Sequence, residues 1–126
     1  MEKSISVILV LVGLINLVPV LGVLGSERLL ALYGQPIQEP NLLILMSHRS
    51  VLFGLLGVFL IAAAWKSEWQ VAAFIAGLVS MLSFVVLARL TGNYNASINK
   101  VVWVDVIASV ALLAASVLYC LKHRLL

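Results

Sequence analysis

The sequence predicts an all-α integral membrane protein that crosses the bilayer four times as a four-helix bundle. Hydrophobic residues make up 63% of the 126 residues and charged residues only 10%, whereas soluble domains average about 45–50% apolar and about 25% charged. A soluble chain of this length could not enclose so much apolar surface, so we expect the bilayer to solvate it. The length suits a single transmembrane domain, residues 1–126, without a separate soluble catalytic domain.

Four apolar stretches are long enough to cross the hydrocarbon core, which takes about 20 helical residues. They cover approximately Ile5–Leu24, Leu42–Trp65, Val71–Leu90 and Val101–Leu121. Helices are expected because strict two-residue alternation is absent and the stretches are too long for barrel strands. We expect the boundaries to hold to within about three residues.

The connection Gly25–Asn41 is the longest and contains a predicted short helix. Within it, Ser26–Tyr33 has eight residues, too few to cross the bilayer, and is expected to lie along the interface. Ser26 is predicted to cap this helix, and Gly34 is predicted to end it before Pro36.

The other two connections are shorter. Lys66–Glu68 forms a tight turn between Trp65 and Trp69, which are typical interfacial anchors. Thr91–Lys100 is polar, and Gly92 is a plausible end for the third span.

The orientation rests on basic residues, because an even number of spans places both termini on one side. The two sides carry four basic residues each: Lys3, Lys66, Lys122 and Arg124 with the termini, and Arg28, Arg49, Arg89 and Lys100 opposite. Three of the second group are discounted because polar or acidic partners can hold them. The basic C-terminal tail then favours cytoplasmic termini in a bacterial inner membrane.

Five polar residues inside the spans define the candidate site. Ionisable groups within a span are costly and usually face the protein interior or a wet cavity. The predicted ligand-binding residues, all toward the side with the two long polar connections, are Asn16, His48, Arg49, Arg89 and Asp105. A secondary set from the connections is Glu27, Arg28, Asn93, Tyr94 and Asn95.

Asp105 is the strongest candidate, about five residues or roughly 7 Å inside the fourth helix. A carboxylate that caps or pairs near a helix N-terminus explains it as well as a functional role does. His48 could carry a proton, bind a ligand or form hydrogen bonds in the core, and we favour the last. A metal site is not expected, since no second histidine lies nearby.

Arg49 and Asn16 each have two interpretations. Arg49 lies opposite a stripe of small residues on the second helix, so it either pairs with Asp105 or extends to lipid headgroups, and we favour the headgroups. Asn16 either faces a ligand or only bonds between helices. Because Pro19 cannot donate to the Ile15 carbonyl, the first helix should kink beside Asn16.

Several classes of function are disfavoured. The net charge of +3 is scattered along the chain and gives no nucleic-acid-binding patch. A lone cysteine, Cys120, excludes an internal disulfide and a cysteine metal cage. Phosphate-binding loops, paired catalytic carboxylates and nucleophile triads are missing, so we lean against an enzyme and identify no cofactor.

Three stretches, Glu27–Gly34, Met46–Gly54 and Gly92–Asn95, resemble a group of short bacterial four-helix membrane proteins that are loosely similar to the DoxX-like proteins. DoxX-like relatives include membrane subunits of a thiosulfate:quinone oxidoreductase, so the resemblance implies proximity to a quinone. Some similar proteins are labelled phosphopantetheine adenylyltransferases. The residues do not support that activity, because His48–Val51 departs from the His-x-Gly-His motif and no sheet pattern is present.

Three hypotheses for function follow. In the first, the polar residues line a pocket that binds a quinone, a lipid or a small anion. In the second, the chain is an accessory or structural subunit of a membrane complex. Its small-residue stripes then pack against helices of a second copy of the chain or of a partner subunit. In the third, Asp105 and His48 serve a proton-coupled carrier, although the chain lacks the inverted repeat of many transporters.

Overall fold

The structure, a computed structural model, describes residues 2–20, 25–34 and 39–125. This part of the chain is helical and contains no strand: α1 (Glu2–Leu17), α2 (Ser26–Tyr33), α3 (Pro40–Ala63), the 3-10 helix η2 (Ser67–Trp69), α4 (Gln70–Thr91) and α5 (Ala96–Leu125). Four of these helices are long and apolar enough to cross a membrane. The predicted fold class is therefore confirmed.

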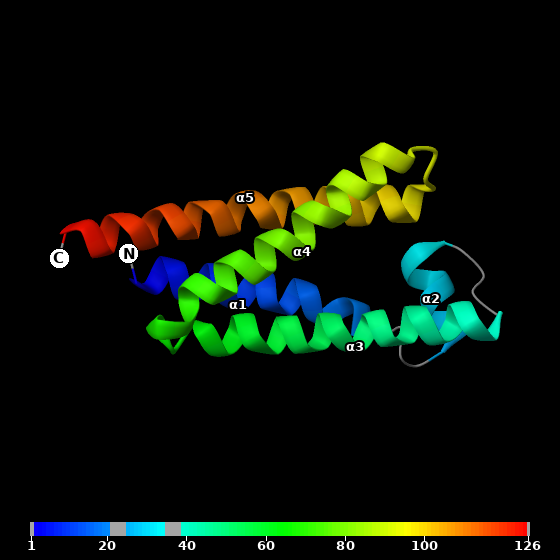
Figure 1. Cartoon of the computed structure of the whole chain (residues 1–126), viewed down its shortest axis with the longest axis horizontal. Coiled ribbons are helices and arrows are strands. Elements are labelled where there is room, and N and C mark those ends of the chain that lie inside the picture. Colours follow the sequence, from blue (N-terminus) through cyan, green and yellow to red (C-terminus); the bar gives the residue numbers. More distant parts are fainter. Residues whose placement is uncertain (1, 21–24, 35–38, 126) are drawn as a thin grey trace.

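The four long helices run along the length of the molecule (Figure 1). The start of α1, the end of α5 and the turn between α3 and α4 lie together at one end, which we call the terminal end. Helix α2 and the α4–α5 connection lie at the other, which we call the loop end. Helix α1 packs most extensively on α3, and α4 packs on α5. Helix α4 diverges from α3 on the way to the loop end.

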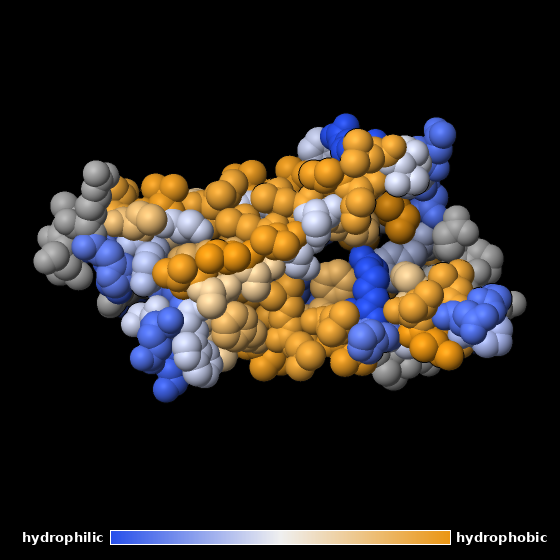
Figure 2. All heavy atoms as spheres, viewed as in Figure 1, coloured by the Kyte–Doolittle hydropathy of each residue, from blue (hydrophilic) through white to orange (hydrophobic). Residues whose placement is uncertain are grey.

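Large apolar side chains cover the outside of the long helices. Leu90 is 78% exposed, Ile44 67% and Leu55 65%. Figure 2 shows hydrophobic atoms along most of the length and hydrophilic atoms gathered toward the two ends. Soluble proteins rarely expose contiguous apolar surface of this extent, whereas lipid contact requires it. The chain is a multi-pass membrane protein.

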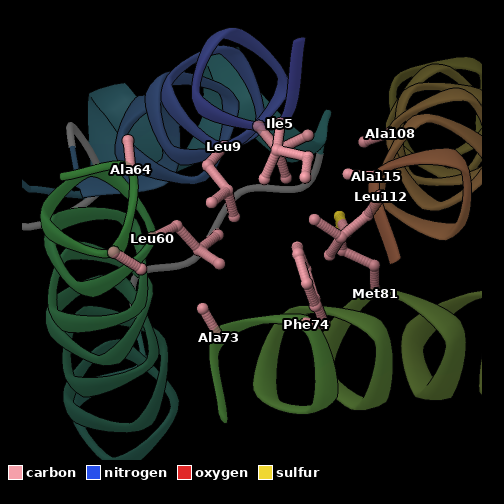
Figure 3. Close-up of a cluster of buried hydrophobic side chains, with 12 residues drawn as sticks. Ile5, Leu9, Leu60, Ala64, Ala73, Phe74, Met81, Ala108, Leu112 and Ala115 are labelled. Carbon is pink, nitrogen blue, oxygen red and sulfur yellow. The ribbon is translucent and has the colours of Figure 1, made fainter. Parts of the chain in front are cut away.

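A hydrophobic core fills the half of the molecule nearer the terminal end. Its side chains come from all four long helices and point toward one another (Figure 3). The most buried members include Leu9, Leu60, Ala73, Leu112 and Ala115, each with no exposed surface. This core lies on the terminal side of the polar residues Asn16, Arg49 and Asp105.

Helices α1 and α3 approach so closely that glycine is required at their contact. A Cβ atom on Gly13 would lie 2.6 Å from Ile61 Cγ1 and 2.8 Å from the Gly57 carbonyl oxygen. A Cβ atom on Gly57 would lie 2.8 Å from the Gly13 carbonyl oxygen. These distances are shorter than real Cβ contacts, so the two backbones pack in the small-residue manner of membrane helices.

The turn between α3 and α4 is tight, as predicted. The Gln70 side-chain amide donates to the Ala63 carbonyl oxygen at 3.0 Å and ties the two helices together. Trp65 and Trp69 are both exposed beside the turn, at 75% and 42%. The Lys66 ammonium lies 5.8 Å from the centre of the Trp69 ring.

Helices α3 and α4 match their predicted spans to within three residues, but α5 does not. It begins at Ala96, five residues before the predicted start at Val101, and it ends four residues after the predicted Leu121. The Asn95 side-chain oxygen accepts a hydrogen bond from the Ile98 N–H at 2.8 Å. Because Asn95 caps the helix, the polar residues that follow it form the first turn of α5.

The first span also differs from its prediction. Helix α1 ends at Leu17, and a 3-10 turn follows over residues 18–20. Pro19 lies in this turn and removes one backbone donor, which accounts for the change of helix type beside Asn16. Residues 21–24 of the predicted span lie outside the described residues.

The short helix α2 is confirmed, with one correction at its start. Its end is as predicted, because Gly34 has φ 68° and its N–H donates to the Leu30 carbonyl oxygen at 2.8 Å. The cap position is Gly25 and not Ser26, because Gly25 has φ 127°, a conformation that favours glycine, and Ser26 is already helical. Pro36 lies outside the described residues.

Glu39 caps the N-terminus of α3. Its carboxylate accepts hydrogen bonds from the backbone N–H groups of Leu42 at 2.9 Å and Asn41 at 3.1 Å. Pro40 occupies the first helical position, where a backbone donor is not needed. The two N–H donors, Leu42 first, hold the pKa of the Glu39 carboxyl below its ordinary value.

Acid is expected to remove the stabilisation that Glu39 provides. Because the folded-state pKa is depressed, this contribution is complete above the unfolded-state pKa of about 4.3 and is lost as the pH falls through the folded-state pKa. Denaturation midpoints of the wild type and Glu39→Gln in detergent should differ at pH 7 and converge as the pH falls below the folded-state pKa of Glu39, which is lower than the unfolded-state pKa. A difference that does not change with pH would contradict this role.

Candidate ligand-binding pocket

A pocket of about 380 Å³ lies at the loop end, lined by α1, α2, α3, α5 and the turn after α1. This volume is near the lower end of the roughly 300–1,000 Å³ typical of small-molecule sites. Most of the lining is apolar and includes Ile15, Val18, Leu32, Phe53, Val101 and Val104. The polar lining residues are Asn16, Tyr33, Arg49, Ser97, Lys100 and Asp105.

Three of the five predicted ligand-binding residues line this pocket, namely Asn16, Arg49 and Asp105. His48 and Arg89 do not line it, and both are exposed. His48 immediately precedes Arg49 on α3, so its side chain points about 100° away from that of Arg49 around the helix axis. Arg89 belongs to α4, which does not contribute to the pocket. Because His48 is exposed, the hydrogen-bonded core position that we favoured for it is not the one that the structure shows.

Arg49 is held in the pocket wall by aromatic side chains. Its guanidinium carbon lies 4.6 Å from the ring centre of Phe53, 5.1 Å from that of Tyr33 and 5.4 Å from that of Phe84. These distances are within the range of about 6 Å for cation–π attraction. Arg49 Nη1 also donates a hydrogen bond to the Tyr33 hydroxyl oxygen. We favoured an Arg49 side chain that extends to the lipid headgroups, but the structure places it half-buried among these aromatic rings.

Asp105 is half-buried and faces the same pocket. Arg49 acts on it electrostatically, but no side chain in the described part of the chain forms a hydrogen bond or an ion pair with it within 4.0 Å. A carboxylate that served only to hold helices together would have such a partner. The unpaired carboxylate is therefore open to whatever occupies the pocket.

Asn16 closes the inner side of the pocket and is 3% exposed. Its amide nitrogen donates to the Val12 carbonyl oxygen at 2.9 Å and lies 3.9 Å from Met81 Sδ. The amide thus bonds within α1 and contacts α4, where the core begins. One helix turn further along the Asp105 face, Ser109 is buried and its hydroxyl has no partner among the described residues.

Helix α2 is fixed across the loop end by Tyr33 and its neighbours. Tyr33 is 4% exposed and packs with Leu32, Leu43, Met46 and Ile98. The Asn95 side-chain amide donates to the Tyr33 carbonyl oxygen at 2.8 Å. The Ser97 side chain at the start of α5 approaches so closely that a Cβ atom on Gly34 would lie 2.9 Å from Ser97 Oγ. These contacts place the Tyr33 hydroxyl where Arg49 can reach it.

The secondary residues predicted from the connections do not share one environment in the structure. Asn95 caps α5 and binds the backbone of α2, and Tyr94 is half-buried. Glu27 and Asn93 are exposed, and the side chain of Arg28 lies outside the described part of the chain. Within the described ranges, no three His, Cys, Asp or Glu side chains gather as a metal ion would require.

Among the polar and aromatic residues that line the pocket, four were not predicted from the sequence: Tyr33, Phe53, Ser97 and Lys100. A signal for Phe53 was present, because it follows Arg49 by four positions and so shares its helix face. Tyr33 could not be found in this way, because its place depends on how α2 folds back against α3 and α5.

Replacing Asn95 should loosen α2 and the start of α5 together. Asn95→Ala loses a cap worth about 0.5–2 kcal/mol and a further hydrogen bond worth about 0.5–1.5 kcal/mol. Asn95→Asp keeps the acceptor for Ile98 but cannot donate to Tyr33, so it should loosen α2 alone. Amide hydrogen exchange in detergent measures both effects. The exposed Asn99→Ala is the control, and equal exchange in all four proteins would contradict the prediction.

Comparison with known proteins gives no relative: no family model, no curated protein and no solved structure matches this chain. The likeness to the DoxX-like proteins therefore stays a prediction, and the pocket itself is the basis for inferring a function.

Proposed function

We propose that this membrane protein binds one small amphipathic molecule, a lipid or a quinone, in the pocket at the loop end. The observation that carries the proposal is the guanidinium of Arg49, fixed by three aromatic rings at the wall of a largely apolar pocket. Apolar lining suits a hydrocarbon or ring body. The donors of Arg49, Lys100 and Ser97 suit a head that accepts hydrogen bonds.

The alternatives have less support. A small inorganic anion would leave most of the apolar lining unused. An accessory subunit would need the small-residue stripe of α3 to be free for a partner helix. Gly57 of this stripe already packs against Gly13 of α1 in the same chain. A proton-coupled carrier that uses Asp105 and His48 finds only the first of them at the pocket.

A pocket-filling variant tests the proposal. Val101 lines the pocket, so Val101→Trp should displace the ligand, whereas Val110→Trp adds the same bulk to an exposed position of α5. Each protein is purified in a mild detergent, and the small molecules that remain bound are identified by native mass spectrometry. The wild type and Val110→Trp should retain a common bound species that Val101→Trp loses. Equal retention, or no bound species in the wild type, would overturn the proposal.

We further propose cytoplasmic termini in a bacterial inner membrane. Arg49 is held in the pocket wall and is not a loop charge, which leaves four basic residues with the termini against three opposite. Fusions of a fluorescent protein and of alkaline phosphatase to the C-terminus test this orientation. Fluorescence without phosphatase activity is expected, and the reverse pattern would mean that the termini are periplasmic.

A further inference from the structure

A second hollow lies next to the pocket, between α3 and α4. This groove has a volume of about 290 Å³ and is lined by Leu52, Leu56, Ser80, Ser83, Phe84 and Leu87, together with Arg49 and Phe53. Figure 2 shows the surface hollowed between α3 and α4, with hydrophilic atoms inside an otherwise hydrophobic face. Leu52 and Leu87 are 50% and 63% exposed, so the groove opens toward the lipid.

Arg49 stands at the border between the two hollows. Its guanidinium reaches Phe84 of α4 on the groove side and the Tyr33 hydroxyl on the pocket side. Arg49 and Phe53 line both hollows. A molecule that passes from the groove to the pocket must therefore pass the guanidinium.

The guanidinium has unused capacity to bind an anion. It carries five N–H donors, and within the described part of the chain its one hydrogen-bond acceptor is the Tyr33 hydroxyl. A cation at this depth is costly unless an anion or an acceptor compensates it. The pocket side chains have a net positive charge whether Asp105 is ionised or not, because Arg49 and Lys100 outnumber it.

On this basis, and resting on the proposed function, we infer that the ligand is a long-chain carboxylate, a fatty-acid anion, that enters sideways from the bilayer between α3 and α4. Its carboxylate lies in the pocket against Arg49, whose planar fork matches a carboxylate. Its acyl chain trails into the groove along Leu52, Leu56 and Leu87. A neutral quinone head would not balance the net positive charge of the pocket, in which Arg49 and Lys100 outnumber Asp105.

The test uses the full-length protein, freed of bound lipid and placed in phosphatidylcholine nanodiscs. A palmitate with a diazirine in its chain is photo-crosslinked, and the labelled residues are identified by mass spectrometry. Labelling is expected on the groove-facing residues of α3 and α4. Excess palmitate should compete, whereas hexadecanol, which has the same chain without charge, should compete at least tenfold more weakly. This comparison is made on the wild-type protein and does not depend on the folding of any variant.

Matched arginine variants locate the headgroup. Arg49→Gln should weaken palmitate binding at least tenfold, while Arg89→Gln, an exposed arginine of α4 outside both hollows, should not change it. Labelling elsewhere, or equal competition by hexadecanol, would overturn the inference. If a short-chain ubiquinone competes and palmitate does not, the carboxylate inference fails but the proposed pocket stands. If neither competes and Val101→Trp changes nothing, the proposed function fails as well.

Discussion

Gly57→Leu is expected to prevent α1 and α3 from packing and to leave little folded protein. Even a methyl group at this position would meet the Gly13 carbonyl oxygen at 2.8 Å and Leu17 Cγ at 2.9 Å. Because the nearest obstacle is backbone, rotation of a side chain cannot relieve the clash. Overpacking of this kind costs about 1–3 kcal/mol and sometimes more, and α1 has its most extensive contact at this interface.

The measurement is unfolding by SDS in mixed micelles, followed by proteolysis. Ala72→Leu adds the same side chain at an exposed position of α4 and should unfold like the wild type. Gly57→Ala should be intermediate between the wild type and Gly57→Leu. If Gly57→Leu and the wild type unfold at the same SDS fraction, the close approach of the two backbones would be contradicted.

Asp105→Asn and Arg49→Gln are expected to change anion binding in opposite directions. Removing the Asp105 carboxylate takes away the negative side chain of the pocket and leaves Arg49 and Lys100, so a fatty-acid anion should bind more tightly. A change of about 1.4 kcal/mol corresponds to a factor of ten in the dissociation constant, and we expect a change of about that size. Arg49→Gln should weaken binding by at least as much.

Titration of palmitate in nanodiscs measures both variants, and Glu68→Gln in the exposed turn between α3 and α4 is the charge-matched control. The control should bind like the wild type. Weaker binding by Asp105→Asn would mean that the carboxylate holds the ligand or keeps the pocket in shape, and it would contradict repulsion between Asp105 and the bound anion.

The fold was largely predictable, because the bilayer imposes long apolar helices whatever the details of packing. The end of α2 was also predictable, since Gly34 supplies a conformation that other residues rarely adopt. The start of α5 was not, because the polar residues after Asn95 look like loop until one knows that the Asn95 side chain caps them. Polar composition alone does not separate a loop from a capped first turn.

The candidate site was predictable only in part. Depth along each helix can be counted from the sequence, and this count selected Asn16, Arg49 and Asp105 correctly as residues near one level. The direction of each side chain depends on how each helix is rotated about its own axis. Counting residues along a helix does not give that rotation. His48 and Arg89 lie at similar depth but on other faces.

The position of the ligand-binding pocket at the loop end has a consequence for lipid sorting. A bilayer consists of two leaflets, and a bilayer centred on the four spans would place the pocket residues at the loop end in only one of them. With cytoplasmic termini, this is the leaflet on the far side of the membrane from the cytoplasm. An amphiphile made in the cytoplasm would then have to flip between leaflets before this protein could bind it, so occupancy would report the composition of a single leaflet.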